Sequence, residues 1–169
     1  MNDNIPHQHA GSFTIRRVAQ GDREPWQKLY RQYAEFYRVE VNDAVLEQTW
    51  SWLMAPEHPE EGIVVELANG VLAGMAHYRA FPKPLLGQDA GFLDDLFVLP
   101  AHRGEGIGRG LVAAVAAIAR ERGWPLVRWI TAHDNTPARH LYDGMAEATT
   151  WVTYDLNPAM HEQPERGKR

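Results

Sequence analysis

The sequence predicts an α/β fold that occupies one domain. Its 169 residues suit a single compact domain with a buried core, and its composition, 44% hydrophobic and 23% charged, is close to the globular average. Segments with strand-like alternation are interspersed with segments of helical periodicity, an order that favours α/β layers over a helical bundle. Residues 13–156 are expected to form the domain, between flexible polar tails at 1–12 and 157–169.

Two helices are predicted in the first third of the chain, after a short strand at residues 13–18. Asp22 is placed to cap the first helix, which continues toward Arg38. Its aromatic and aliphatic residues recur every three or four positions, so that they form one broad face to bury. Asn42 is placed to cap the second helix, which ends before Pro56.

A hairpin and a buried strand are predicted next. Residues 62–67 and 71–81 have strand character and flank the turn-forming residues 68–70. Prolines and a glycine then break the chain. Residues 91–99 are apolar on both faces apart from two acids, which is typical of a strand inside a sheet.

The last third of the chain carries the clearest helical pattern. Residues 106–122 are rich in alanine and place their larger apolar side chains on one stripe, which predicts a helix. Residues 126–132 are expected to form a strand, residues 136–145 a helix, and residues 149–156 a last strand.

Composition excludes several classes of protein. The 17 basic residues are outnumbered by 22 acidic ones, so the basic footprint of a nucleic-acid binder is missing. The lack of cysteine excludes disulfide scaffolds, thiolate zinc sites and a cysteine nucleophile, and the histidines lack ligand spacing, so we expect no metal. No stretch approaches the roughly 18 apolar residues that span a bilayer, and we expect a cytoplasmic protein without a membrane partner.

The strongest local signal is the segment 102–110, which has glycines at 104, 106, 108 and 110 and lies between a buried strand and a long helix. Glycines at such a junction let free amides point outward at the positive end of the helix dipole, where phosphates bind. The spacing matches neither the dinucleotide fingerprint nor the nucleoside triphosphate loop. The alternative is an ordinary glycine-rich turn.

The chain has two separated motifs. The segment Arg103-x-x-Gly106-x-Gly108 follows a strand that ends at Phe97 and Val98, and a second segment contains Asn135, Ala138 and Tyr142. In this order and spacing, the two segments resemble the acetyl-CoA motif and the later motif of the GNAT family of N-acetyltransferases. The resemblance covers residues 13–156 and is closest to polyamine and histone-type members. It implies a mixed, mostly antiparallel sheet flanked by helices on both faces, with acetyl-CoA as co-substrate.

The resemblance also implies roles for individual residues. Tyr142 would protonate the departing thiolate, although packing is its alternative role. Asn135 and Ala138 would contact the cofactor arm, and Asn135 is also placed to cap the helix that follows it. Backbone groups would hold the pantetheine arm at Leu96, Phe97 and Val98, with the Val98 amide on the developing oxyanion. The pyrophosphate would lie on Arg103, Gly104, Glu105, Gly106, Ile107 and Gly108.

Asp94 and Asp95 are adjacent acids in the middle of a predicted strand. Successive side chains in a strand point to opposite faces, so only one of these acids is expected to share a face with Leu96 and Val98. We favour Asp94 as the base that takes the acceptor's proton through water, with Asp95 attracting its positive charge. The alternative for these acids is a structural salt bridge to Arg79 or Arg128.

Three more residues are candidates for the acceptor site. His77, on the preceding strand, is expected to border the cleft, although a lone histidine is more often packed or exposed. Phe36 and Tyr37 lie on the first helix, whose equivalent lines the acceptor site in the polyamine enzymes that the chain resembles. Core packing is the alternative role for these aromatic residues.

The expected activity is direct transfer of acetyl from acetyl-CoA to a primary amine, either a small amine or a polyamine-like one, in a ternary complex. Two alternatives stay open: a protein lysine or N-terminal acetyltransferase, and a sensor that binds acyl-CoA without turnover. The resemblance makes a homodimer reasonable, with contributions from Trp151, Val152 and Tyr154 on the last predicted strand.

Overall fold

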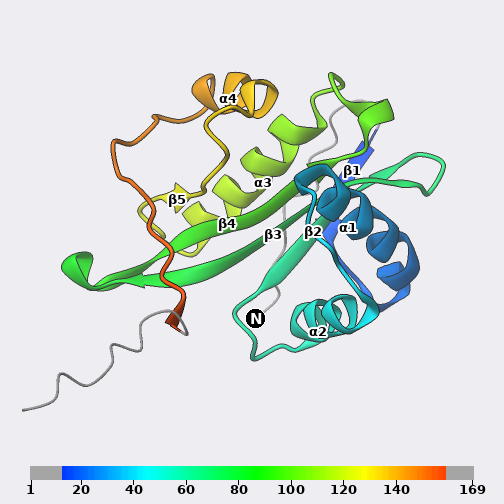
Figure 1. The fold of residues 1–169 in the computed structure, drawn as a ribbon, viewed down its shortest axis with the longest axis horizontal. Coiled ribbons are helices and arrows are strands. Elements are labelled where there is room, and N and C mark those ends of the chain that lie inside the picture. The colour runs from blue at the N-terminus through cyan, green and yellow to red at the C-terminus, as the bar shows by residue number, and fades with distance from the viewer. Residues whose placement is uncertain (1–12, 159–169) are drawn as a thin grey trace, which may run out of the picture. The chain divides into compact units, whose positions relative to one another are not determined.

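The computed structural model describes residues 13–158, which fall into two compact units that divide between Asn135 and Thr136. The first unit holds a five-stranded sheet (Figure 1). Its strands, in sheet order, are β1 (Phe13–Arg17), β2 (Glu61–Leu67), β3 (Leu72–Lys83), β4 (Gln88–Val98) and β5 (Val127–Arg128). Neighbours pair antiparallel except for β4 and β5, which are parallel. The predicted α/β class and mostly antiparallel sheet are confirmed. The N-terminal tail predicted at 1–12, and most of the C-terminal one, lie outside the described residues.

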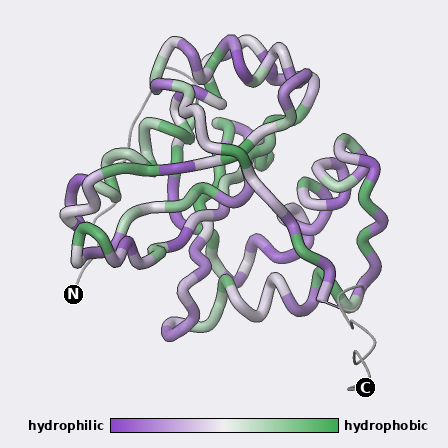
Figure 2. The backbone as a smooth tube through the Cα atoms, turned by 60° about the vertical axis from the view of Figure 1, so that its left-hand side comes forward, coloured by the Kyte–Doolittle hydropathy of each residue, from purple (hydrophilic) through white to green (hydrophobic). Residues whose placement is uncertain are grey.

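Helices cover both faces of this sheet (Figure 1). On one face, α1 (Arg23–Tyr37) and α2 (Asp43–Met54) enclose a core. Its buried residues are Trp26, Leu29, Leu46, Trp50, Val64, Leu72, Met75 and Phe97. On the other face, α3 (Ile107–Glu121) lies so close that a Cβ on Gly74 would meet Ile107 at 3.1 Å. Hydrophobic and hydrophilic residues alternate along the helices in Figure 2, as expected of helices with one buried face.

The local signals of the first half are largely confirmed. The Asn42 side chain accepts a hydrogen bond from the Val45 amide at 3.0 Å, which is the predicted cap of α2. In the turn between β2 and β3, Gly70 has a φ of 80°. Asp22 precedes α1 but does not cap it. Its carboxylate accepts instead from the Arg16 guanidinium and the Ala19 amide, because an arginine offers a stronger, charged donor.

β3 and β4 form a hairpin that was not predicted, and both strands extend further toward its turn than predicted. Pro82 does not end β3, which continues to Lys83 and pairs Pro82 with Asp89. A proline removes only the one hydrogen bond that its own N–H would donate, so a long ladder tolerates it near its end. Gly87, with a φ of 62°, closes the turn before β4 begins.

In the last third of the chain, one predicted strand is shorter than expected and the other is absent from the described residues. Of the predicted strand 126–132, only Val127–Arg128 pairs. Residues 149–156 form no strand within the described part of the chain. Alternation gives a segment one face to bury, but it supplies no hydrogen-bonding neighbour, and a strand requires both. In the second unit, α4 (Thr136–Asp143) forms as predicted. No helix within residues 13–158 has the length and apolar character needed to cross a membrane.

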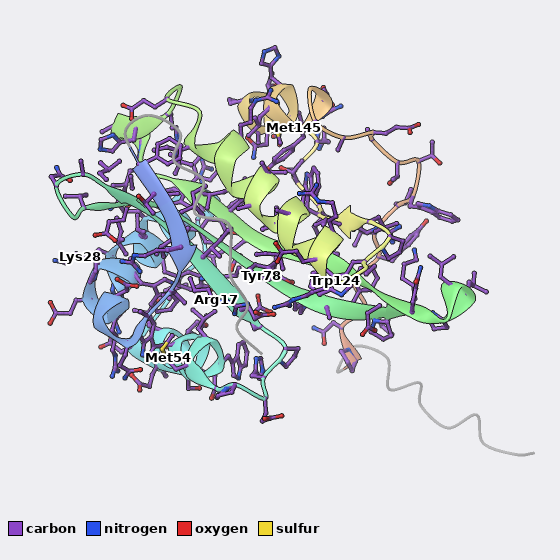
Figure 3. The ribbon with its side chains drawn as sticks, turned by 180° about the vertical axis from the view of Figure 1, so that it is seen from behind. Arg17, Lys28, Met54, Tyr78, Trp124 and Met145 are labelled. Carbon is purple, nitrogen blue, oxygen red and sulfur yellow. The ribbon has the colours of Figure 1, made fainter. Side chains whose placement is uncertain are left out.

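A partly buried ionic network holds the first residue of β2. The Glu61 carboxylate accepts from Arg17 of β1 at 2.6 Å and from Arg122, which directly follows α3. The hydroxyl of Tyr78, on β3, donates to the same carboxylate at 3.4 Å. Figure 3 shows Arg17 and Tyr78 close together. Burial raises the pKa of Glu61, but the two guanidinium groups outweigh it and lower that pKa below its ordinary value.

Candidate functional site

The outer edge of β4 is open over its last residues. β5 pairs with β4 only at Gly91 and Phe92, so the described sheet offers no neighbour to Leu93–Val98 on that side. The Leu99 amide donates to Ala73 of β3 at 2.9 Å. Because amides alternate in direction along a strand, those of Leu96 and Val98 point toward the open edge. The Val98 carbonyl points the same way and accepts from Arg103.

The glycine-rich segment continues from this edge into α3. Gly104 and Gly106 have φ values of 84° and 82°, the left-handed region that favours glycine. The first helical hydrogen bond runs from the Gly110 amide to the Gly106 carbonyl. The three preceding helical amides therefore have no acceptor within α3 and lie at the positive end of its dipole. A Cβ at Gly104 or Gly106 would meet no atom within 4 Å, so the space beside the turn is open. This arrangement suits an anion.

Arg103 contacts the aromatic C-terminal end of α1. Its Nε donates to the Val98 carbonyl at 3.2 Å, and its guanidinium lies 5.3 Å from the centre of the Phe36 ring. Phe36 therefore lies beside the glycine-rich segment. Tyr37 packs edge-on against Phe36 and is exposed. Glu105 is also at the surface, where its carboxylate contacts the His102 ring.

A β-bulge brings both aspartates to the same face of the sheet, contrary to prediction. His77 pairs with Asp95 and Tyr78 pairs with Leu93, so Asp94 is the extra residue in the ladder. An extra residue in one strand shifts the alternation of side chains by one position. Asp94 consequently contacts Arg79, and Asp95 contacts His77, on the face that α1 covers.

Asp95 is held by a buried hydrogen-bond chain. The Trp26 indole donates to Nε2 of His77 at 2.9 Å, and Nδ1 of His77 lies 2.8 Å from the Asp95 carboxylate. An indole N–H can only donate, so Nε2 accepts and the ring proton is on Nδ1, facing Asp95. The Tyr33 hydroxyl also bonds to Asp95. Burial raises the pKa of Asp95, but the hydrogen bonds from His77 and Tyr33 bring it below its ordinary value. His77 itself is 1% exposed, so its role is to position Asp95 through their hydrogen bond and not to contact a substrate.

Replacing His77 with Leu is expected to lower the free energy of unfolding by about 1–3 kcal/mol, because Trp26 and Asp95 would each lose a buried partner. Urea denaturation at pH 7 measures the change. His140→Leu, at an exposed position of α4, should change stability by less than about 0.5 kcal/mol. Equal losses in both variants would contradict the positioning role of His77.

Asp94 and Glu60 both contact the Arg79 guanidinium. Arg79 Nε is 3.1 Å from the Asp94 carboxylate and 3.8 Å from that of Glu60. The salt bridge considered for Asp94 is therefore present, and its partner is Arg79. Burial raises the pKa of Asp94, and Arg79 offsets this only in part. Burial, with the charge of Asp94, raises the pKa of Glu60 to about 7.

Sequence reasoning missed Glu60. Glu60 directly precedes β2 and is remote in sequence from Asp94. The register that aligns Glu61 with Tyr78 brings Glu60 to Arg79, and no local pattern predicts that register. Within residues 13–158, no group of three or more His, Asp or Glu side chains has an arrangement that could hold a metal ion.

The remaining candidates lie at or beyond the division between the units. Asn135 ends the first unit, and its side-chain amide donates to the Thr131 hydroxyl at 3.2 Å. In the second unit, Ala138 and Tyr142 are four residues apart on α4 and so share one face of that helix. Tyr142 is half-buried, and its carbonyl accepts from the amides of Met145 and Ala146.

Comparison with known proteins identifies relatives over most of the chain. The model of the acetyltransferase (GNAT) family matches residues 26–145. The D-amino-acid N-acetyltransferase of Saccharomyces cerevisiae is 29% identical over 144 residues, 85% of this chain and 89% of that protein. The ribosomal-protein-alanine N-acetyltransferase of Brucella melitensis superposes with a TM-score of 0.71 at 26% identity, covering 86% of this chain and 98% of that one. An aminoglycoside N-acetyltransferase solved with CoA has a TM-score of 0.73 at 24% identity, covering 89% and 99%.

Proposed function

Because the chain belongs to the acetyltransferase (GNAT) family and is an N-acetyltransferase, we propose that it moves acetyl from acetyl-CoA to a primary amine, small or polyamine-like. Transfer is direct, within a ternary complex. The observation that carries the choice of acceptor is a group of three neighbouring carboxylates: Glu60 and Asp94 contact Arg79, and Asp95, which contacts His77, acts on the charge state of both. Their excess negative charge favours a cationic amine.

In this proposal acetyl-CoA lies along the open edge of β4 and ends at α3. The outward amides of Leu96 and Val98 hold the pantetheine arm, together with the backbone of Phe97 between them. The pyrophosphate binds at the segment Arg103–Gly108, where free amides and the helix dipole favour an anion. Asn135 and Ala138 contact the cofactor arm.

The proposed chemistry begins with the amine. A free alkylamine has a pKa of about 10.4, so at neutral pH roughly one molecule in a thousand is nucleophilic. Asp94, the more exposed of the two aspartates, receives the ammonium proton through water. The nitrogen attacks the thioester carbonyl, and the Val98 amide stabilises the oxyanion by roughly 3 kcal/mol. Tyr142 then protonates the departing thiolate.

The acceptor residues have distinct tasks. Asp94 and Asp95 attract the cation, and His77 keeps Asp95 ionised and fixed, as its buried contacts indicate. Phe36 and Tyr37 flank the acceptor at the exposed end of α1. Three apolar residues of the second unit are exposed and are the proposed contacts of a homodimer: Trp151, Val152 and Tyr154. Sedimentation velocity tests this, since a monomer at all concentrations would contradict it.

The test of the proposed function is CoA release measured with acetyl-CoA and a panel of polyamines, amino acids, aminoglycosides and short peptides. Turnover with a cationic small amine is expected. Turnover only with peptides would indicate a protein acetyltransferase, as in the ribosomal-protein enzyme that the chain resembles. Tight CoA binding without turnover toward any amine would indicate a sensor.

A further inference from the structure

Among the carboxylates of Glu60, Asp94 and Asp95, that of Glu60 has an oxygen without a hydrogen-bond partner. The Asp95 carboxylate accepts from His77 and Tyr33, and both oxygens of Asp94 lie within 3.3 Å of the Arg79 guanidinium. Glu60 reaches Arg79 with Oε2 alone, at 3.8 Å. Its Oε1 is buried and has no hydrogen-bond partner. In a buried position, an anionic oxygen without a donor costs much more free energy than a protonated one.

Glu60 is less exposed than Asp94. The side chain of Asp94 is 27% exposed and that of Glu60 is 13% exposed, and both contact Arg79. We therefore expect a cationic amine from solvent to contact Asp94 in preference to Glu60. The charges of Asp94, Asp95 and Arg79 all act on Glu60.

Groups from two strands and a helix act on the charge state of Glu60. Burial and the charge of Asp94 raise its pKa, Asp95 adds to the effect, and Arg79 opposes it. His77 faces it from β3, and Tyr30 faces it from α1. The His58 ring accepts from its backbone amide. The result, a pKa of about 7, lets the group both take up and release a proton at neutral pH.

We propose that Glu60 is the terminal proton acceptor of the reaction, at the end of the relay that starts at Asp94. This rests on the proposed function. The ammonium loses one proton, which passes through water and Asp94 to the Glu60 carboxylate, and the neutral nitrogen then forms the C–N bond as the C–S bond breaks. Tyr142 gives its proton to the CoA thiolate, and the second proton that the nitrogen loses returns to the Tyr142 phenolate, so that the products are the amide and the CoA thiol. After product release, Glu60 returns its proton to solvent.

The variant that tests this is Glu60→Gln, which keeps the shape of the side chain and removes its proton acceptor. Wild-type kcat/KM should fall below about pH 7 as Glu60 becomes protonated. In the variant, kcat/KM should no longer show this fall at acidic pH, called here the acidic limb of the pH profile. Its kcat should decrease about tenfold. The decrease is smaller than the typical 10²-fold of direct proton transfer because Asp94 remains. Glu60→Asp should keep the limb. Glu57→Gln, at an exposed position three residues away, should keep both limb and rate.

Thermal unfolding gives a readout that does not depend on the acceptor. Native Glu60 binds its proton more tightly than the unfolded chain does, so wild-type stability falls as pH rises from about 4.5 to 7. The melting temperature of Glu60→Gln should therefore exceed that of the wild type at pH 8 and match it at pH 5.

Two failures can be told apart. If the wild type is active and Glu60→Gln keeps the acidic limb, the role of Glu60 is overturned. It is also overturned if the difference in melting temperature between the two proteins does not depend on pH. A wild type that acetylates no amine, while the melting difference appears as expected, overturns the proposed function instead.

Discussion

Replacing Tyr142 with Phe is expected to lower kcat by roughly 10²- to 10⁴-fold while the Kd for acetyl-CoA stays unchanged. The phenol is the proposed donor to the CoA thiolate, and the substitution removes only its hydroxyl. The ring remains half-buried on α4, so the helix should fold as before. Steady-state kinetics measures kcat, and isothermal titration with acetyl-CoA measures binding.

A change in the acyl donor separates proton donation from packing. An acetyl thioester of a more acidic thiol needs no proton as it leaves, so it should restore much of the rate of Tyr142→Phe relative to wild type. Tyr154→Phe, at an exposed position of the same unit, is the matched control and should behave as wild type. Full activity of Tyr142→Phe with acetyl-CoA would exclude the phenol as the acid.

The elements that sequence predicts best are those whose signal is local. The Asn42 cap and the turn around Gly70 depend on residues within three or four positions of one another. The glycines before α3 are equally local, because each left-handed φ is a property of one residue. These segments set the β2–β3 hairpin and the turn that precedes α3.

The features that sequence did not predict depend on pairing between distant segments. The bulge at Asp94 arises from the register of β3 against β4. It brings Asp94 and Asp95 to one face of the sheet, whereas strict alternation assigns them to opposite faces. Glu60 reaches Arg79 through the register of β2 against β3. Residues 149–156 have the alternation of a strand but no partner within the described chain. The acidic cluster is thus a product of register, which one sequence does not reveal.

Replacing Gly106 with Val is expected to weaken acetyl-CoA binding by at least roughly 100-fold, about 2.8 kcal/mol. Gly106 is the last residue before α3, and the space beside it, where a Cβ would meet no protein atom, is the proposed place of the pyrophosphate. A branched side chain would fill that space. A valine would also be strained at the left-handed φ of 82° that Gly106 adopts. Relief of that strain would move the following amides away from the geometry that suits an anion.

Gly70→Val is the matched control for the effect of backbone strain alone. Gly70 has nearly the same φ, 80°, and the same open surroundings, but it lies in the β2–β3 turn. Both variants should lose about 1–2 kcal/mol of stability, because a side chain in the left-handed region crowds its own backbone. Only Gly106→Val should lose acetyl-CoA binding by isothermal titration. If Gly106→Val keeps the wild-type Kd, the pyrophosphate does not bind at α3, and the open edge of β4 would have to hold the cofactor alone.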